Sequence, residues 1–436
     1  MEHMFRISVA VLSAILSFAQ YQAVAASVES ISVPVTPPVP NAYIEDIVPI
    51  TLNQTGYPYL IILWAVSDGT ESVPLQILGY DQTLNAYVDQ TAQVIQGAVP
   101  QILNPRNFIV RNLNKSGYPS ILIANQGLDA SPWPGATDTL LLSTSSGQLF
   151  DASSSLPQSL AYAHDVSSGI IAKNRIGIFV NNIYSSPMTP PYFLVDDFSG
   201  KFPDQRSLLP PAVINKFPYP AAYTSSALVD LMGRGLADLV LGQEDLIAGR
   251  SLVYLNPGNG NFSGVLPIYL PNSPLPDTAG LYSNTEIGPV ILDIRPINSM
   301  SSKRSLASKI TDLVVTSTTG NYEGYAFQIL INDGTGHFKD RTTELVSGAP
   351  SEQISQNPNY WVKRAWVVNV NGVSDIVTES GGDLSAPSQV FLNDGSGHFT
   401  LSTSVTGQSF ANFAYIGGTP TLIETNYSTI TLVPFP

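Results

Sequence analysis

The chain has 436 residues, of which 44% are hydrophobic and 12% are charged, so it can bury a large core with fewer charges than most soluble proteins carry. Its net charge of −14 at pH 7 disfavours nucleic acid or an anionic membrane surface as a partner. The absence of cysteine excludes disulfides, thiolate chemistry and cysteine-based zinc sites.

Residues 1–25 have the layout of a secretory signal peptide. A short start that carries Arg6 precedes an apolar stretch over residues 7–19, and Ala23-Val24-Ala25 matches a cleavage site. An uncleaved anchor is the alternative, and the glutamines and serines of this span disfavour it. The pattern predicts a secreted protein, extracellular or periplasmic, that is not inserted in a membrane after cleavage. Residues 26–42 then form a proline-rich linker or a closing strand.

One short phrase recurs seven times from residue 56 onward: a turn residue, two further residues, a variable position and an apolar run. The variable positions mark the copies, and they are Tyr59, Ser120, Gly177, Asp238, Asp312, Asp375 and Thr421. Successive markers lie 46 to 74 residues apart. A period of about 60 residues is near the upper range of propeller blades and longer than solenoid repeats.

A second phrase follows several copies of the first. Asn332-Asp-Gly-Thr-Gly-His-Phe338 is nearly repeated as Asn393-Asp-Gly-Ser-Gly-His-Phe399, and looser copies cover residues 195–202 and 255–262. Asn-Asp-Gly between apolar runs is typical of a tight hairpin, because glycine and asparagine accept a positive φ. Each unit is therefore predicted to be strand, turn and strand, completed by one or two weaker strands. No long segment has helical apolar spacing.

Seven such units predict an all-β fold, a seven-bladed β-propeller over residues 43–436, because radial closure leaves few exposed sheet edges. The last unit lacks the second phrase, and its marker lies close to the end of the chain. We expect an N-terminal segment, residues 30–35 or 43–49, to supply the missing strand and close the ring. A closed ring of this kind is expected to be monomeric.

The two phrases resemble FG-GAP or VCBS repeats, which form the blades of the integrin α-subunit head and of many secreted bacterial proteins. The best copy runs from Val229-Asp230 to Asp238-Leu-Val240 and is followed by Leu255-Asn-Pro-Gly-Asn-Gly-Asn-Phe262. The resemblance covers residues 43–436. It implies a binding or adhesion function, and it implies calcium loops of the form D-x-D-x-D-G-x-x-D within the blades.

The calcium ligands of that pattern are mostly replaced. The fourth copy keeps Asp230 and Asp238, the weak candidates for a metal site, but has Met232 and Arg234 where acids are required. Calcium prefers six to eight oxygen ligands, several of them carboxylates. Calcium is therefore possible but not expected, and no other cofactor is expected. In the structural interpretation, Asn, Ser and Thr close these turns, and three markers cap the entry to the innermost strand: Asp238, Asp312 and Asp375.

The sequence offers few catalytic groups. His164-Asp165 has the residue types of a base and its orienting acid, but no nucleophile motif accompanies it, so a turn or cap role is favoured. His337 and His398 occupy equivalent turns of neighbouring units, too far apart to share a metal. Two adjacent acid pairs are interpreted as solvated loop charges: Asp196-Asp197 and Glu244-Asp245.

Aromatic residues in polar connections are the better functional candidates. Trp133 lies in a rigid Pro-Trp-Pro-Gly loop that is predicted to be exposed, and Tyr360-Trp361 follows an asparagine-rich stretch. Exposed aromatic rings bind partners with a large apolar face at a small entropic cost. The alternative is that these rings cover the protein's own loops.

The sequence therefore favours a secreted, non-catalytic binding or adhesion module that recognises a glycan or a protein through propeller loops. One alternative is a lyase or hydrolase that acts on polysaccharide at the mouth of the propeller, which a cluster of Asp, Arg or His at the axis would favour. Another is a structural part of a cell-surface assembly. Fold-level analogy constrains function only weakly.

Overall fold

The computed structural model describes residues 30–66, 69–130, 132–183, 190–214, 223–244, 250–279, 286–298, 310–347, 354–355, 361–381, 388–402, 409–426 and 428–435. The proposed signal peptide lies outside these residues. In the described part of the chain, no helix is long and apolar enough to cross a membrane.

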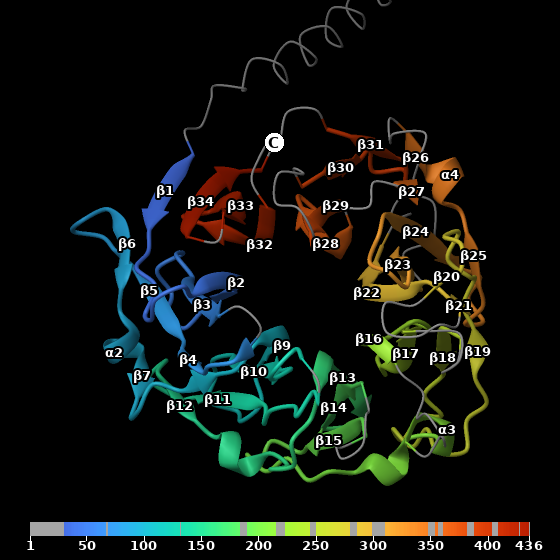
Figure 1. Cartoon of the computed structure of the whole chain (residues 1–436), viewed down its shortest axis with the longest axis horizontal. Coiled ribbons are helices and arrows are strands. Elements are labelled where there is room, and N and C mark those ends of the chain that lie inside the picture. The colour runs from blue at the N-terminus through green and yellow to red at the C-terminus, as the bar shows by residue number, and fades with distance from the viewer. Residues whose placement is uncertain are drawn as a thin grey trace, which may run out of the picture.

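Seven sheets surround a central axis, so the predicted seven-bladed β-propeller is confirmed (Figure 1). From the axis outward, the first blade consists of β2 (Tyr43–Ile50), β3 (Tyr59–Ala65), β5 (Gln76–Asp81) and β6 (Ala86–Asp89), and the second of β9 (Pro105–Arg111), β10 (Ser120–Asn125), β11 (Thr139–Ser143), β12 (Leu149–Asp151) and β7 (Ile95–Gln96). The third blade consists of β13 (Ala163–Ala172), β14 (Arg175–Asn182) and β15 (Tyr192–Asp196). The fourth consists of β16 (Tyr223–Val229), β17 (Asp238–Gln243), β18 (Leu252–Tyr254) and β19 (Ile268–Tyr269).

The remaining three blades continue the ring in the same way. The fifth blade consists of β22 (Val290–Ile297), β23 (Asp312–Thr318), β24 (Tyr325–Asn332) and β25 (Phe338–Asp340), with β27 (Ile354–Ser355) beside β24. The sixth consists of β28 (Val362–Val370), β29 (Val373–Ser380), β30 (Val390–Asn393), β31 (Phe399–Leu401) and β26 (Val346–Ser347). The seventh consists of β32 (Ser409–Ile416), β33 (Thr419–Thr425), β34 (Thr429–Pro434) and β1 (Ile31–Pro34).

Short elements connect the blades. They are the pairs β4 (Val73–Pro74) with β8 (Gln101–Ile102) and β20 (Thr278–Ala279) with β21 (Glu286–Ile287), and the single turns α2 (Thr91–Val94), α3 (Pro211–Ile214), α4 (Thr342–Leu345), η2 (Ser153–Ser155) and η3 (Arg206–Leu208). Helix is as scarce in the described residues as the sequence predicts.

The hydrophobic core is divided among the contacts between neighbouring blades. Seven clusters of buried apolar side chains occur in the described residues, and each joins two successive blades, including the last to the first. The second strand of a blade is covered on both faces, which is why β10, β17 and β23 are buried along their whole length.

The recurrent apolar phrase forms this second strand, and the expectation that Asp238, Asp312 and Asp375 begin the innermost strand is wrong. The innermost strands precede the phrase and face the axis (Figure 1). A strand packed between two neighbouring blades needs apolar residues on both faces, whereas a strand at the axis presents one face to polar surroundings.

The two recurrent phrases are linked by hydrogen bonds within a blade. The carboxylate of Asp238 accepts a hydrogen bond from the main-chain N–H of Asn256 at 2.7 Å. Asp312 accepts one from Asn332 at 2.9 Å, and Asp375 accepts one from Asn393 at 2.7 Å. Each of these aspartates, at or near the start of a second strand, therefore holds the hairpin turn that follows the third strand.

An N-terminal strand closes the ring, as expected. β1 pairs with β34 in antiparallel fashion, with Val33 opposite Ile430, so the last blade combines strands from both ends of the described chain (Figure 1). Of the alternatives, residues 30–35 supply this strand, whereas residues 43–49 belong to β2 of the first blade.

Replacing Val33 by aspartate is expected to lower the free energy of unfolding by about 2 kcal/mol or more, because the side chain is buried between the last and first blades. Urea denaturation measures the change. Ser32→Asp is the matched control, because Ser32 is exposed on the same strand. Equal effects of the two substitutions would contradict the assignment of β1 as the closing strand.

Candidate functional site

Each innermost strand contains a β-bulge at the same position. The register against the second strand skips one residue, for example between Ile44 and Asp46 and between Val362 and Arg364. The seven residues that follow the bulges define what we call the axial ring: Asp46, Asn107, Asp165, Ser225, Asp293, Arg364 and Asn412. A bulge re-aims side chains and often lies beside a functional site.

The chemistry of the bulge explains why aspartate and asparagine recur in the ring. The side-chain oxygens of Asp46, Asn107, Asp165 and Asn412 each accept a hydrogen bond from the main-chain N–H of the next residue, all at 2.8 Å. These short side chains thus satisfy a main-chain donor that the irregular register leaves without its usual partner.

The ring residues also connect one blade to the next. Asn107 donates a hydrogen bond to Asp165. The Ser225 hydroxyl donates to the Ile291 carbonyl at 2.8 Å, and the Asn412 amide closes the circle by donating to the Ile47 carbonyl at 2.8 Å. The inner ends of the blades are therefore fixed by polar contacts as well as by the apolar core.

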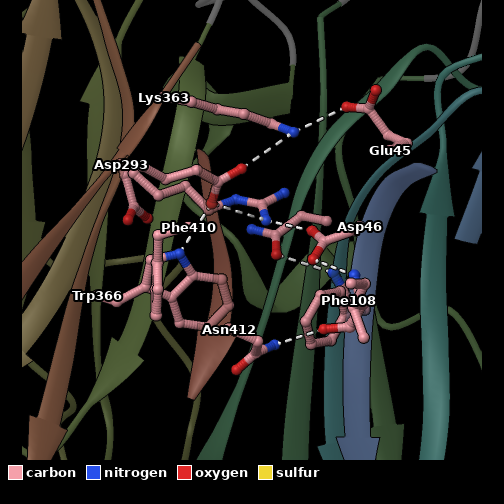
Figure 2. Close-up of polar contacts among 12 residues, drawn as sticks. Glu45, Asp46, Phe108, Asp293, Lys363, Trp366, Phe410 and Asn412 are labelled. Atoms are coloured by element: carbon pink, nitrogen blue, oxygen red, sulfur yellow. Dashed lines mark hydrogen bonds and ion pairs between the residues drawn. The ribbon is translucent and has the colours of Figure 1, made fainter. Parts of the chain in front are cut away.

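Arg364 is the cation of the ring, and it reaches from the sixth blade to the first two. Its guanidinium donates to the Asp46 carboxylate and to the Arg106 carbonyl, and it lies 3.6 Å from the Glu379 carboxylate. Arg364 is 3% exposed. Burial alone would lower its pKa, but the charges of Asp46 and Glu379 outweigh burial and raise the pKa. Figure 2 shows this network beside Asp293 and Trp366.

Lys363, the bulged residue before Arg364, bridges two carboxylates (Figure 2). Its ammonium lies 2.8 Å from Glu45 and 3.4 Å from Glu379. Burial would raise the pKa of Glu45, but the charges of Lys363 and Arg106 outweigh it and lower that pKa. The pKa of Glu379 is raised, because burial outweighs the charges of Arg364 and Lys363. The two carboxylates therefore have different proton affinities beside one ammonium.

A cavity of about 560 Å³ lies on one side of the axial ring. Several of the residues that line it come just before the ring residues in the innermost strands. We call it the Trp361 cavity. The first, second, sixth and seventh blades line it with a mixture of aromatic, charged and small residues: Tyr43, Ile44, Glu45, Gly69, Asn104, Arg106, Asp129, Trp361, Lys363, Glu379, Ser380, Gly381, Ser409, Phe410, Ala411 and Thr425. Of the two cavities that described residues line at the axis, it is the larger.

The Trp361 ring is held as one wall of this cavity. A Cβ atom on Gly381 would lie 2.2 Å from the ring, so only glycine allows the ring to lie this close to the main chain. Tyr322 contacts the ring edge to face, with centroids 5.7 Å apart. The Trp361 carbonyl accepts a hydrogen bond from the Gly381 N–H at 2.9 Å. The wall is therefore rigid before any ligand arrives.

A second cavity of about 320 Å³ lies on the opposite side of the ring, lined by the second to fifth blades, and includes Asp165, Asp293 and Arg295. Arg295 is paired with Asp293 at 2.8 Å and lies over the Trp366 ring, 5.0 Å from its centroid. The axial ring and Trp366 therefore separate two cavities with different linings.

The structure separates the aromatic candidates from each other. Trp361 lines the larger cavity. Trp133 does not line it; this residue is half-buried with a φ of 49°, rather than exposed as expected. Tyr360 lies outside the described residues. Of the three, Trp361 is the one with a defined place in a cavity.

The candidate metal loop of the fourth blade is occupied by an ion pair. Arg234 donates to the Asp238 carboxylate at 2.7 Å, and the Asp230 carboxylate accepts main-chain hydrogen bonds from Arg234 and Gly235 at 2.9 and 2.6 Å. Within the described ranges, no group of three or more His, Cys, Asp or Glu residues is arranged to hold a metal ion.

His164 and Asp165 do not form a base and its orienting acid. Asp165 accepts hydrogen bonds from Asn107, Val166 and Ser226 instead. Burial, followed by the charge of Arg106, lowers the pKa of His164 well below its usual range, so the imidazole is neutral at pH 7. Its Nε2 atom is buried without a hydrogen-bond partner among the described residues.

The other acidic and histidine candidates have local roles. Asp196 is fully buried in β15, so its interpretation as a solvated charge is wrong; burial raises its pKa to about 6. Its neighbour Asp197 is exposed, and Asp245 lies outside the described residues. The rings of His337 and His398 contact the hydroxyls of Thr335 and Ser396 within their own turns, at 3.0 and 2.9 Å.

The fold and the site together define a seven-bladed β-propeller whose axis is filled by a polar ring beneath a charged, aromatic cavity. No protein-family model matches this sequence, and none of the curated proteins compared with it matches. Among solved structures, the chain is similar to a crystal structure of BBS1N in complex with ARL6DN, soaked with lead. The two are 11% identical with a TM-score of 0.47, over 94% of this chain and 98% of that chain. A likeness of this degree assigns no partner to the present chain.

Proposed function

We propose that this protein is a secreted, non-catalytic binding module and that the Trp361 cavity receives its glycan or protein ligand. The observation that carries the proposal is the composition of this cavity, in which one aromatic wall faces charged and polar groups at the inner ends of four blades. Binding sites commonly combine apolar walls with a few polar groups that fix the ligand's orientation.

The rigidity of the site supports binding. Glu45, Lys363 and Glu379 are held in one ion-paired network, and Trp361 is packed against Gly381. A wall that is already ordered costs little conformational entropy when a ligand covers it. The volume of about 560 Å³ lies in the range of small-molecule sites, which suits one or two sugar rings or a short peptide segment.

Replacing Trp361 by alanine is expected to weaken ligand binding at least about tenfold, because aromatic anchors contribute about 2 kcal/mol or more. A glycan array identifies the ligand, and calorimetry then measures the change in affinity. Binding is expected to be the same with calcium and with a chelator, because the Arg234 guanidinium already pairs with Asp238.

Tyr269→Ala is the matched control for this experiment. Tyr269 is an aromatic residue that is 52% exposed on the fourth blade and lines neither cavity. It is expected to leave binding unchanged. Binding that survives Trp361→Ala, or that is lost equally in both variants, would contradict the placement of the site.

A lyase or hydrolase that acts on polysaccharide is the second candidate. It is favoured by Glu45 and Glu379, two carboxylates that line the cavity and whose pKa values are shifted in opposite directions. Environments that separate two pKa values are typical of acid–base pairs. An enzyme would shorten the bound polysaccharide, and Glu379→Gln would abolish that reaction while retaining binding; a binding module would release no product.

A further inference from the structure

The Trp361 cavity contains two cations among its described lining residues, and only one of them is paired. Lys363 contacts Glu45 and Glu379. The guanidinium of Arg106 makes no hydrogen bond or ion pair with any described residue. Arg106 is nevertheless half-buried, and its charge lowers the pKa of Glu45, which places it near that carboxylate. Its five N–H donors are therefore available to a ligand.

The backbone fixes the position of Arg106. It is the bulged residue of β9, in the same structural position as Glu45 in β2 and Lys363 in β28. Its carbonyl accepts a hydrogen bond from Arg364, so the main chain at this point is tied to the axial ring. A guanidinium on such a fixed base presents a planar fork that matches a carboxylate with two parallel hydrogen bonds.

The rest of the lining selects which carboxylate ligand fits. Glu45, Asp129 and Glu379 are all acidic, so within the cavity they would repel any ligand carboxylate other than the one that Arg106 binds. These groups accept hydrogen bonds, which suits a ligand with several hydroxyl donors. The Trp361 wall provides an apolar surface for the C–H face of a ring. One carboxylate, several hydroxyls and one flat face per unit describe a uronic acid.

We infer that the ligand of the Trp361 cavity is a saccharide containing uronic acid units, whose carboxylate is bound by Arg106. This inference rests on the proposed function, because it names the class of ligand for the same site. The ligand carboxylate supplies the missing partner of Arg106, the hydroxyls contact the acidic side chains, and the sugar ring packs on Trp361.

Calorimetry with defined oligosaccharides tests the inference. The probes are oligomers of galacturonate and of glucuronate, each with its carboxyl-reduced, neutral counterpart. The wild-type protein is expected to bind an acidic oligomer about 10- to 100-fold more tightly than its neutral counterpart, the range for a hydrogen-bonded charge. Arg106→Gln is expected to remove this preference, and Arg106→Lys to retain part of it.

Arg250→Gln is the matched control, because Arg250 is an exposed arginine on the fourth blade that lines neither cavity. It is expected to keep the full preference for the acidic oligomers. The melting temperature of Arg106→Gln should stay close to that of the wild type, since the guanidinium has no partner in the described structure. This comparison separates loss of the ligand contact from loss of the fold.

Equal affinity for acidic and neutral oligomers in the wild type would overturn the inference, as would a preference that persists in Arg106→Gln. If neutral glycans then bind through Trp361, the proposed function is supported and the uronic acid inference is wrong. If none of the saccharides binds the wild type, the inference is wrong, and the proposed function then depends on a protein ligand. Arg106-dependent binding of a poly-glutamate peptide, without binding of the oligouronates, would replace the saccharide with an acidic peptide.

Discussion

Replacing Arg364 by methionine is expected to lower the free energy of unfolding by about 3 to 5 kcal/mol. Methionine fills much of the arginine volume but leaves Asp46 and Glu379 buried beside one another without the guanidinium. The Arg106 carbonyl also loses its donor. Removing one partner from a buried ion pair costs more than the pair itself contributes, because an uncompensated charge remains. Urea denaturation measures the effect.

A second substitution tests this explanation. Asp46→Asn in the Arg364→Met background removes one of the uncompensated charges, so the double variant is expected to be more stable than Arg364→Met alone. Arg341→Met is the control, because its pair with Glu344 has side chains 39% and 48% exposed and is expected to contribute less than about 1 kcal/mol. A similar loss in Arg341→Met and Arg364→Met would contradict a special role for the axis.

Replacing Asn332 by alanine is expected to lower the free energy of unfolding by about 2 to 4 kcal/mol. Its side-chain amide donates to the carbonyls of Leu231 and Thr311, at 3.0 and 3.2 Å, and its oxygen accepts from the N–H groups of Gly334 and Gly336. The residue is fully buried, so the Thr311 carbonyl and the two glycine N–H groups would lose these partners, while the Leu231 carbonyl would keep its hydrogen bond from the Thr311 N–H.

The equivalent asparagine of the next blade is the matched control. The Asn393 amide donates to the Ser374 carbonyl of its own blade at 3.1 Å, and the residue is half-buried. Asn332 in contrast reaches Leu231 of the preceding blade. Asn393→Ala is therefore expected to cost less than Asn332→Ala in thermal or urea denaturation. An equal cost would show that the contact between blades contributes nothing.

The fold could be predicted because its repeat is local. The apolar phrase and the Asn-Asp-Gly turn recur in sequence, and each forms the same strand or hairpin wherever it occurs. The apolar phrase was predicted to form the innermost strand, but it forms the second strand of each blade. An apolar run indicates that a strand is buried, but it does not indicate the position of that strand in the sheet. The pairing of β1 with β34 was predicted from a missing strand rather than from any property of β1 itself.

The candidate site was largely missed for the opposite reason. The ring positions hold chemically different residues, such as Asp46, Asn107, Ser225 and Arg364. They therefore share no recurrent residue type that could be recognised in the sequence. A signal was nevertheless present: in the first four repeats the ring residue lies 12 or 13 residues before the marker. The pairing of Arg364 with Asp46 joins the sixth blade to the first, and nothing in the local sequence indicates such a contact.

The variety of the ring residues has a consequence for how such a protein can change. Each bulge presents one side chain to the axis at a point where the sheet ladder is already interrupted. A substitution there alters the charge of the axis while the second strands and the seven cores between blades keep their residues. The bulged residues that precede the ring residues include four that line the Trp361 cavity: Glu45, Arg106, Lys363 and Ala411. Ligand preference can therefore diverge at these positions among descendants of this chain without a new fold.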